Sequence, residues 1–237
     1  MKEKSLVIDS SASAAKVAPK IIKPELGGVY LDILMEVHKP SGELVSQHQE
    51  LGRSFLANFI KMLYSSAMIN EAPTADGVAL TLFDTDGVER AGLDSALQSI
   101  LSSSEFMDCN GLGTNDEQGI LVGTDDGTIL PKDINNYALG AKCSEGTGTS
   151  QLNYGTHSIV TPVDDDSTYS YAGITRTASN GSGASIGVNE VGLVCYGRWD
   201  HNVTSRYFML IRDILGTPVT VPNGDTLTVS YRCKCFC

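Results

Sequence analysis

The stretch from Tyr169 to the C-terminus decides the fold. It begins Y-S-Y-A-G-I-T-R-T (169–177), continues as I-G-V-N-E-V-G-L-V-C-Y (186–196) and R-Y-F-M-L-I-R-D-I-L (206–215), and reaches T-L-T-V-S-Y (226–231). Apolar and polar residues alternate through these segments, and Gly, Pro and Asn interrupt them. This pattern is typical of consecutive half-buried antiparallel strands. The stretch therefore predicts a sheet on which the rest of the chain packs.

The end of this stretch contains turn signals and a charged interruption. Asn223-Gly224 predicts a hairpin. Pro218 and Pro222 lack N–H donors, so we expect them at strand starts or edges. Arg212 and Asp213 interrupt an apolar strand, which indicates that they pair across an edge or an interface. In the last strand, alternate residues are expected to share a face: Leu227, Val229 and Tyr231 on one side, and Thr226, Thr228 and Ser230 on the other.

The chain upstream predicts more strands and one helix. The expected strands are residues 29–37, 43–50, 78–83, 119–123 and 154–160. Residues 54–66 change to a helical period, in which Phe55, Phe59, Met62 and Leu63 recur and Ser54 is placed to cap the start. We expect this stripe to pack on the sheet.

Length and composition favour one domain between two terminal segments. A chain of 237 residues can bury a sizeable core. Residues 1–24 are rich in Ser, Ala and Lys, so we expect an N-terminal arm, either disordered or ordered on a neighbouring subunit. Residues 25–232 are expected to form a single antiparallel β-sandwich, jelly-roll-like, with one packed α-helix. Residues 233–237 form a Cys-rich C-terminal tail.

Charge and hydropathy exclude several partners. The net charge of -11 at pH 7 argues against nucleic acid and anionic membranes, which both require a basic face. No apolar run approaches the roughly 20 residues of a membrane helix. Asp9 stops the short apolar run at the N-terminus, so we expect no secretory signal and synthesis in a cytosol.

Three motifs resemble catalytic or metal-binding signatures. Residues 183–187 spell G-x-S-x-G, but strand residues follow them where a hydrolase requires a helix. Residues 84–87 spell D-x-D-G, which lacks the remainder of a calcium loop and predicts a turn. Asp164, Asp165 and Asp166 are expected in a solvated turn, with a cation site shared between subunits as the alternative.

Histidines and aromatic residues give weaker signals. His38, His48, His157 and His201 are far apart and lack metal-ligand spacing. His201 follows Cys195, Trp199 and Asp200, where a loop between strands is the simpler interpretation and a Cys–His catalytic pair the alternative. Trp199 with Tyr169, Tyr171, Tyr196 and Tyr207 could form a sugar platform, although core or interface packing is the commoner use. We therefore expect no catalytic, cofactor or metal site.

Six cysteines fall into two groups. Cys109, Cys143 and Cys195 are scattered and typical of small buried hydrophobic residues. Cys233, Cys235 and Cys237 would share one face of a continuing strand, about 7 Å apart and too far for bonds to one another. They would bond to the first group, to an adjacent subunit or to a metal, or stay buried and reduced. Our hypothesis is that some form disulfides that lock an assembly outside the reducing cell.

Several of these segments together resemble a family. They are I-T-R-T (174–177), N-G-S-G-A (180–184), V-N-E-V-G-L (188–193), L-I-R-D-I-L (210–215) and P-V-T-V-P-N-G-D-T-L-T-V-S-Y (218–231). Upstream stand S-F-L-A-N-F-I-K-M-L-Y (54–64), G-I-L-V-G-T (119–124) and Y-A-L (137–139). The set resembles poorly characterised structural proteins of tailed bacteriophages. The resemblance implies a β-sandwich virion subunit and no catalytic residues, and it does not cover the N-terminal arm or the Cys-rich tail.

The expected function is therefore assembly. We expect a non-enzymatic virion subunit of the head, neck or tail that contacts copies of itself and other virion proteins in closed rings or trimers. The main alternative is a receptor- or glycan-binding adhesin module with an aromatic patch around Trp199. An enzyme is the third alternative, and it would need a pocket joining His157 or His201 to a nucleophile.

Overall fold

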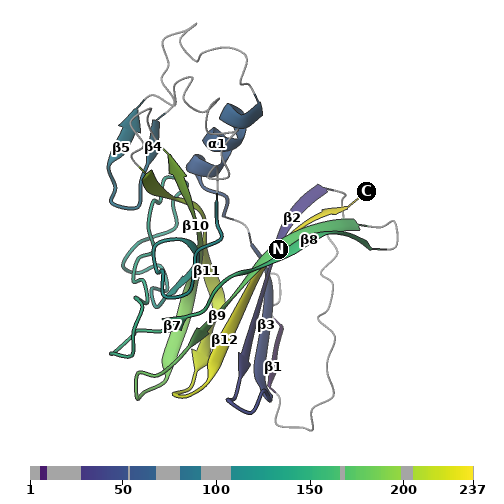
Figure 1. Cartoon of the computed structure of the whole chain (residues 1–237), viewed down its shortest axis with the longest axis vertical. Helices are drawn as coiled ribbons and strands as arrows, with labels where there is room; N and C mark the ends of the chain where they lie inside the picture. Colours follow the sequence, from purple (N-terminus) through teal and green to yellow (C-terminus); the bar gives the residue numbers. More distant parts are fainter. Residues whose placement is uncertain are drawn as a thin grey trace, which may run out of the picture.

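The described part of the chain forms packed antiparallel sheets with one short helix (Figure 1). The computed structural model describes residues 6–9, 28–52, 54–67, 81–91, 108–165, 169–198 and 205–236. The prediction of a mostly β, antiparallel, sandwich-like fold with a packed helix is confirmed.

The larger sheet has seven strands, in the order β1-β3-β2-β12-β9-β7, with β8 also paired to β9. Its central strand β12 pairs along its whole length with β2 on one side and β9 on the other. The strands are β1 (Leu6–Asp9), β2 (Gly28–His38), β3 (Leu44–Gly52), β7 (Asn153–Tyr154), β8 (Ser158–Asp165), β9 (Tyr169–Ser179) and β12 (Thr226–Phe236).

The smaller sheet has three strands, in the order β11-β10-β6. It comprises β6 (Gly119–Gly123), β10 (Ile186–Arg198) and β11 (Ser205–Val221). A hairpin of β4 (Thr81–Phe83) and β5 (Glu89–Ala91) lies with helix α1 (Ala57–Ala67) at one end of the sandwich (Figure 1). Pro218 lies in β11, an edge strand of its sheet, as its missing N–H predicts.

The prediction of a hairpin at Asn223-Gly224 is wrong. β11 pairs with β10, whereas β12 pairs with β2 and β9, so this turn carries the chain from one sheet to the other. Residues 180–185, between β9 and β10, make the same crossing. Asn180 joins the two crossings, because its carbonyl accepts from Gly224 N at 2.7 Å and its amide donates to Val221 O at 2.8 Å.

The core lies between the facing sheets. The predicted faces of β12 are confirmed, because Leu227, Val229 and Tyr231 are buried while Thr226, Thr228 and Ser230 are half-buried on the other face. In β2, Ile33, Met35 and Val37 are fully buried, as the period of two requires. All five residues of β6 are buried, which confirms the wholly apolar run as a buried strand, although β6 is an edge strand of its sheet.

The helix begins later than its sequence predicts. It starts at Ala57, and the Ser54 hydroxyl has no hydrogen-bond partner, so Ser54 does not cap it. The chain is instead held by tertiary contacts at this point: Phe55 bridges to Ile211, and Ser54 O accepts from Arg212 N at 3.2 Å. Met62 is buried as predicted, but Leu63 is 50% exposed and lies outside the packed stripe.

Three other boundaries differ from the predictions. Leu6–Asp9 form β1 on the edge of β3, within the expected arm. The predicted strand at 154–160 is broken, since β7 ends at Tyr154 and β8 begins at Ser158. β8 continues through Asp164 and Asp165, because pairing with β9 supplies their backbone hydrogen bonds, so these two residues do not lie in a turn.

Candidate functional site

One end of the larger sheet extends beyond the sandwich (Figure 1). We define the projecting end as residues 28–32 of β2, 160–165 of β8, 169–173 of β9 and 232–236 of β12, together with Ser158 and Ile159 of β8 at its base, where they pair with Thr175 and Ile174. The pairing of β2 with β3 ends at Leu31 opposite Gly52, so β2 continues beyond the end of β3. Among the described residues, β8 pairs only with β9, so the projecting end presents the outer edge of β8.

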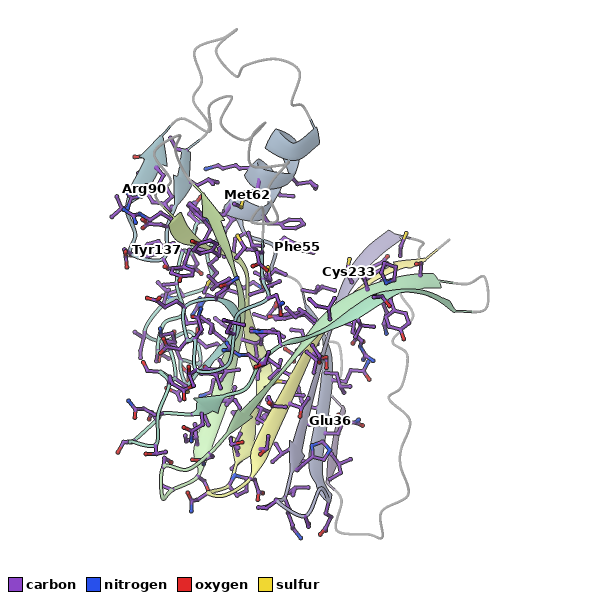
Figure 2. All side chains as sticks on the ribbon, viewed as in Figure 1. Glu36, Phe55, Met62, Arg90, Tyr137 and Cys233 are labelled. Carbon is purple, nitrogen blue, oxygen red and sulfur yellow. The ribbon has the colours of Figure 1, made fainter. Side chains whose placement is uncertain are left out.

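The cysteines of the last strand lie on one face of the projecting end. β12 runs through the expected Cys-rich tail, and Cys233 and Cys235 alternate in phase with buried Tyr231. Both are exposed, because the smaller sheet does not reach them; Figure 2 marks Cys233 where the strands leave the sandwich. Ile159, whose partner Ile174 faces the core, is 59% exposed on the same side. The side of the larger sheet that faces the core within the sandwich is thus exposed at the projecting end.

The opposite face of the projecting end is closed by a charge cluster. Asp32 lies directly across from Arg232, and its carboxylate contacts both Arg232 and Lys234, the latter at 2.9 Å. Gln49 donates to the second Asp32 oxygen at 2.8 Å. Asp32 is 1% exposed, so these contacts compensate a buried charge and hold β2 and β12 in register.

The prediction that Arg212 and Asp213 pair across an edge or an interface is wrong. Arg212 is 1% exposed and points from the smaller sheet into the loop that covers it. Its guanidinium donates to Glu190 at 2.9 Å, Asp125 at 3.1 Å, Asn136 at 3.0 Å and Leu130 O at 2.9 Å. Asp213 faces the other way, and the Tyr231 hydroxyl lies 3.4 Å from its carboxylate.

Backbone donors complete the Arg212 cluster. Glu190 accepts from Gly140 N and Ala141 N, at 3.1 and 2.8 Å. Burial alone would raise the pKa of Asp125, but the N–H groups of residues 129, 130 and 127 together with the Arg212 charge outweigh it and lower that pKa. The cluster is fully satisfied and fastens the 125–141 loop to β10 and β11.

A second buried arginine fastens another segment. Arg176 on β9 donates to the carbonyls of Gly155, Gln118 and Ile120 at 2.9 to 3.1 Å. It also donates to the carbonyls of Leu112 and Asn115, and it lies 4.4 Å from the centre of the Tyr154 ring. Five carbonyls that lack strand partners are therefore satisfied by one side chain.

His157 lies beside this arginine and is fixed as one tautomer. Its Nε2 accepts from Ile120 N at 2.8 Å, so Nδ1 carries the proton and donates to Gly111 O at 2.7 Å. Burial, together with the nearby charge of Arg176, lowers the pKa of His157 to about 4. His157 thus serves the fold as a neutral ring.

The lowered pKa of His157 predicts a pH dependence of stability. Unfolded histidine titrates near pH 6.5, so the neutral native ring stabilises the fold above that pH, and this contribution is lost as pH falls from 6.5 to about 4. We expect a loss of roughly 1–2 kcal/mol across this window, after allowance for partial solvation. Urea unfolding at several pH values would measure it, and H157Q should flatten the slope. H38Q, which changes a histidine at the end of a strand, should keep the same dependence of the free energy of unfolding on pH. If H157Q and the unmodified chain gave parallel plots of that free energy against pH, His157 would not be the cause.

Two of the motifs that resembled catalytic or metal sites lie in connections between strands. Asp84 accepts from Asp86 N, Val88 N and Arg90, which occupies its oxygens in closing the β4–β5 turn. Ser185 lies in the exposed crossing before β10, followed by a strand. Among the described residues, no three His, Cys, Asp or Glu side chains gather as metal ligands, and no helix there is long and apolar enough to cross a membrane.

The remaining predicted residues are separated or undescribed. Tyr196 and Tyr207 pack at 5.5 Å, half-buried. All five described cysteines are thiols, with Cys143 and Cys195 buried. Trp199, Asp200, His201, Asp166 and Cys237 lie outside the described residues. The aromatic platform and the Cys–His pair therefore stay alternatives, and the placement of the third tail thiol stays a prediction.

The two arginine clusters were missed as sites, although the sequence carries a signal for each. Arg176 and Arg212 stand at inward or covered positions of strongly alternating strands, where a charge requires compensation. Their partners come from loops that carry no recognisable motif. In comparisons with known proteins, no family model, no curated relative and no solved structure matches the chain.

Proposed function

We propose that the chain is a structural subunit of a tailed-phage virion and works through contacts with copies of itself and with other virion proteins. The observation that supports this most directly is the projecting end, where a face that is buried elsewhere carries exposed Ile159, Cys233 and Cys235. Exposed apolar and edge-strand surface of this kind is characteristic of interaction sites. The phage assignment itself rests on the sequence resemblance.

The use of the buried charges supports the same proposal. Arg212, Asp125 and Glu190 bind one another and the backbone, and Arg176 binds backbone carbonyls, so these groups serve to fasten loops. A body whose loops are fastened by buried charges, with one open sheet end, suits a part that is repeated in an assembly.

Light scattering of the full chain, with electron microscopy of the native assembly, tests the proposal. We expect homo-oligomers at micromolar concentration, and I159K should shift them towards monomer, because a charge would be placed in the apolar contact. I129K is the matched control, since Ile129 is 68% exposed on the covering loop, away from the projecting end. A monomer at every concentration, whichever variant is used, would refute self-assembly.

The same oligomers allow the thiols to be tested. In oxidised glutathione, two thiols of adjacent subunits would lose two protons and two electrons and form a bond, while the reagent becomes two molecules of glutathione. A non-reducing gel should then contain linked dimers that C233S/C235S largely lacks and the buried-site variant C143S retains. Identical monomer bands with and without reductant would reject intersubunit bonds at these positions.

A further inference from the structure

Two cysteines far apart in sequence lie opposite each other on the edge of β10. Along this edge, β6 pairs with β10 as far as Gly119, opposite Val194. Beyond that point Asp108 bridges antiparallel to Tyr196. In an antiparallel pair, the residue after Asp108 stands across from the residue before Tyr196. Cys109 is therefore the cross-strand neighbour of Cys195.

The hydrogen bonding defines the geometry of this pair. Tyr196 N donates to Asp108 O at 2.8 Å, which makes Asp108 and Tyr196 a hydrogen-bonded pair. The next pair along an antiparallel ladder is then of the non-hydrogen-bonded type, with Cα atoms about 4.5 Å apart and side chains on the same face. Disulfides span Cα separations of about 4.4–6.8 Å. The backbone at Cys109 and Cys195 therefore suits a bond.

The surroundings of the thiols agree with this placement. Cys195 is fully buried, with Sγ 3.9 Å from Met62 Sδ, and Cys109 packs half-buried against the same core. After burial itself, the proximity of Cys109 is the next cause that raises the pKa of Cys195, which agrees with the two thiols being neighbours. Cys143 lies on the far side of β6, where its N–H donates to Val122 O. Among the described thiols, Cys109 and Cys195 are thus the pair that the fold brings together.

We propose that Cys109 and Cys195 form an intrachain disulfide when the chain folds or opens under oxidising conditions. The inference is independent of the proposed function, because it requires one chain only. The bond would hold residue 109 at the start of the segment whose carbonyls at 112, 115 and 118 bind Arg176. The disulfide would therefore strengthen the attachment of this segment, which Arg176 already holds through its carbonyls.

The chemistry requires a small-molecule disulfide such as oxidised glutathione. One cysteine thiolate attacks the reagent, its S–S bond breaks, and one glutathione leaves with a proton. The second cysteine attacks the mixed disulfide and releases the second glutathione. Two electrons and two protons pass from the protein to two glutathione molecules. Burial raises the pKa of Cys109 to about 12, so exchange should be slow in the native state and fast during folding.

Peptide mapping after refolding tests the proposal. The C233S/C235S/C237S chain is reduced, unfolded, refolded in a glutathione redox buffer or in dithiothreitol, and alkylated. We expect a crosslinked Cys109–Cys195 peptide in the redox buffer only, with Cys143 alkylated. Because the bond closes a long loop, the unfolding midpoint should be about 10 °C above that of the reduced form. The same map of the unmodified chain keeps the test valid if the triple variant folds poorly.

Two variants give the controls. C143S in the triple-serine background should leave the crosslink unchanged, whereas C109S should abolish it and leave Cys195 alkylated. Folded, oxidised protein with both Cys109 and Cys195 alkylated would overturn the proposal. A crosslink from Cys143 to either of them would also overturn it, as would a thermal unfolding midpoint of the oxidised form below that of the reduced form. Each result would mean that the folded chain does not accommodate the Cys109–Cys195 bond at the edge of β10.

Discussion

Replacing Arg212 with methionine is expected to lower the free energy of unfolding by about 3–5 kcal/mol. Methionine keeps much of the aliphatic volume but removes the only cation that contacts Asp125 and Glu190 among the described residues. Both carboxylates are fully buried, so their charges lose compensation in a region where water cannot replace it. Urea unfolding of R212M and the unmodified chain at pH 7 would measure the difference.

The Arg212 cluster also allows charge to be separated from lost packing. In R212M, Glu190 loses the bond from Arg212 but each of its oxygens keeps a backbone donor, so the main fault at Glu190 is an uncompensated buried negative charge. The double variant R212M/E190Q removes that charge and should recover part of the loss, which a double-mutant cycle would report as coupling. K39M is the control, because the exposed Lys39–Glu43 pair should change stability by no more than about 0.5 kcal/mol. If R212M proved as stable as K39M, the cluster would not be an important stabiliser.

The strands could be predicted because the alternation of apolar and polar residues shows which face of a strand is buried. Leu227, Val229 and Tyr231 share the core face in the sequence pattern and in the fold. The pattern does not report which strand lies alongside, since any antiparallel neighbour satisfies the same period of two. This is why Asn223-Gly224 predicted a hairpin, whereas its turn crosses between sheets. The signal at that turn was local, and sheet membership is a tertiary property.

The candidate sites divide in the same way. Cys233 and Cys235 could be placed on one face from their spacing, but their exposure depends on where the smaller sheet ends. Cys109 and Cys195 lie far apart in the sequence, and the bridge between Asp108 and Tyr196 brings them together. Ser54 had the right residue type for a helix cap, yet its backbone bonds to β11 instead. Tertiary contacts therefore override local signals at each of these positions.

Replacing Arg176 with lysine is expected to destabilise the fold by about 2 kcal/mol, although the charge is kept, and R176M by about 3 kcal/mol or more. The reason is geometric. The planar guanidinium reaches the carbonyls of residues 112, 115, 118, 120 and 155 together, whereas a lysine ammonium has three donors on one atom. Buried carbonyls left without a donor cost their full desolvation free energy. Lysine also loses the contact of the guanidinium with the Tyr154 ring.

Urea unfolding combined with amide hydrogen exchange would measure both the size and the place of the Arg176 effect. Exchange should accelerate in residues 108–120, because their carbonyls lose the side chain that fixes them, while β2 and β12 should change little. K142M is the matched control, since Lys142 is an exposed cation that contacts Asp116 in the same region. This substitution should change the free energy of unfolding by about 0.5 kcal/mol. Equal stability of R176K and the unmodified chain would mean that charge alone suffices there. A fall in R176K with unchanged exchange at 108–120 would place the loss elsewhere, so the two measurements together decide whether Arg176 fastens this segment to the larger sheet.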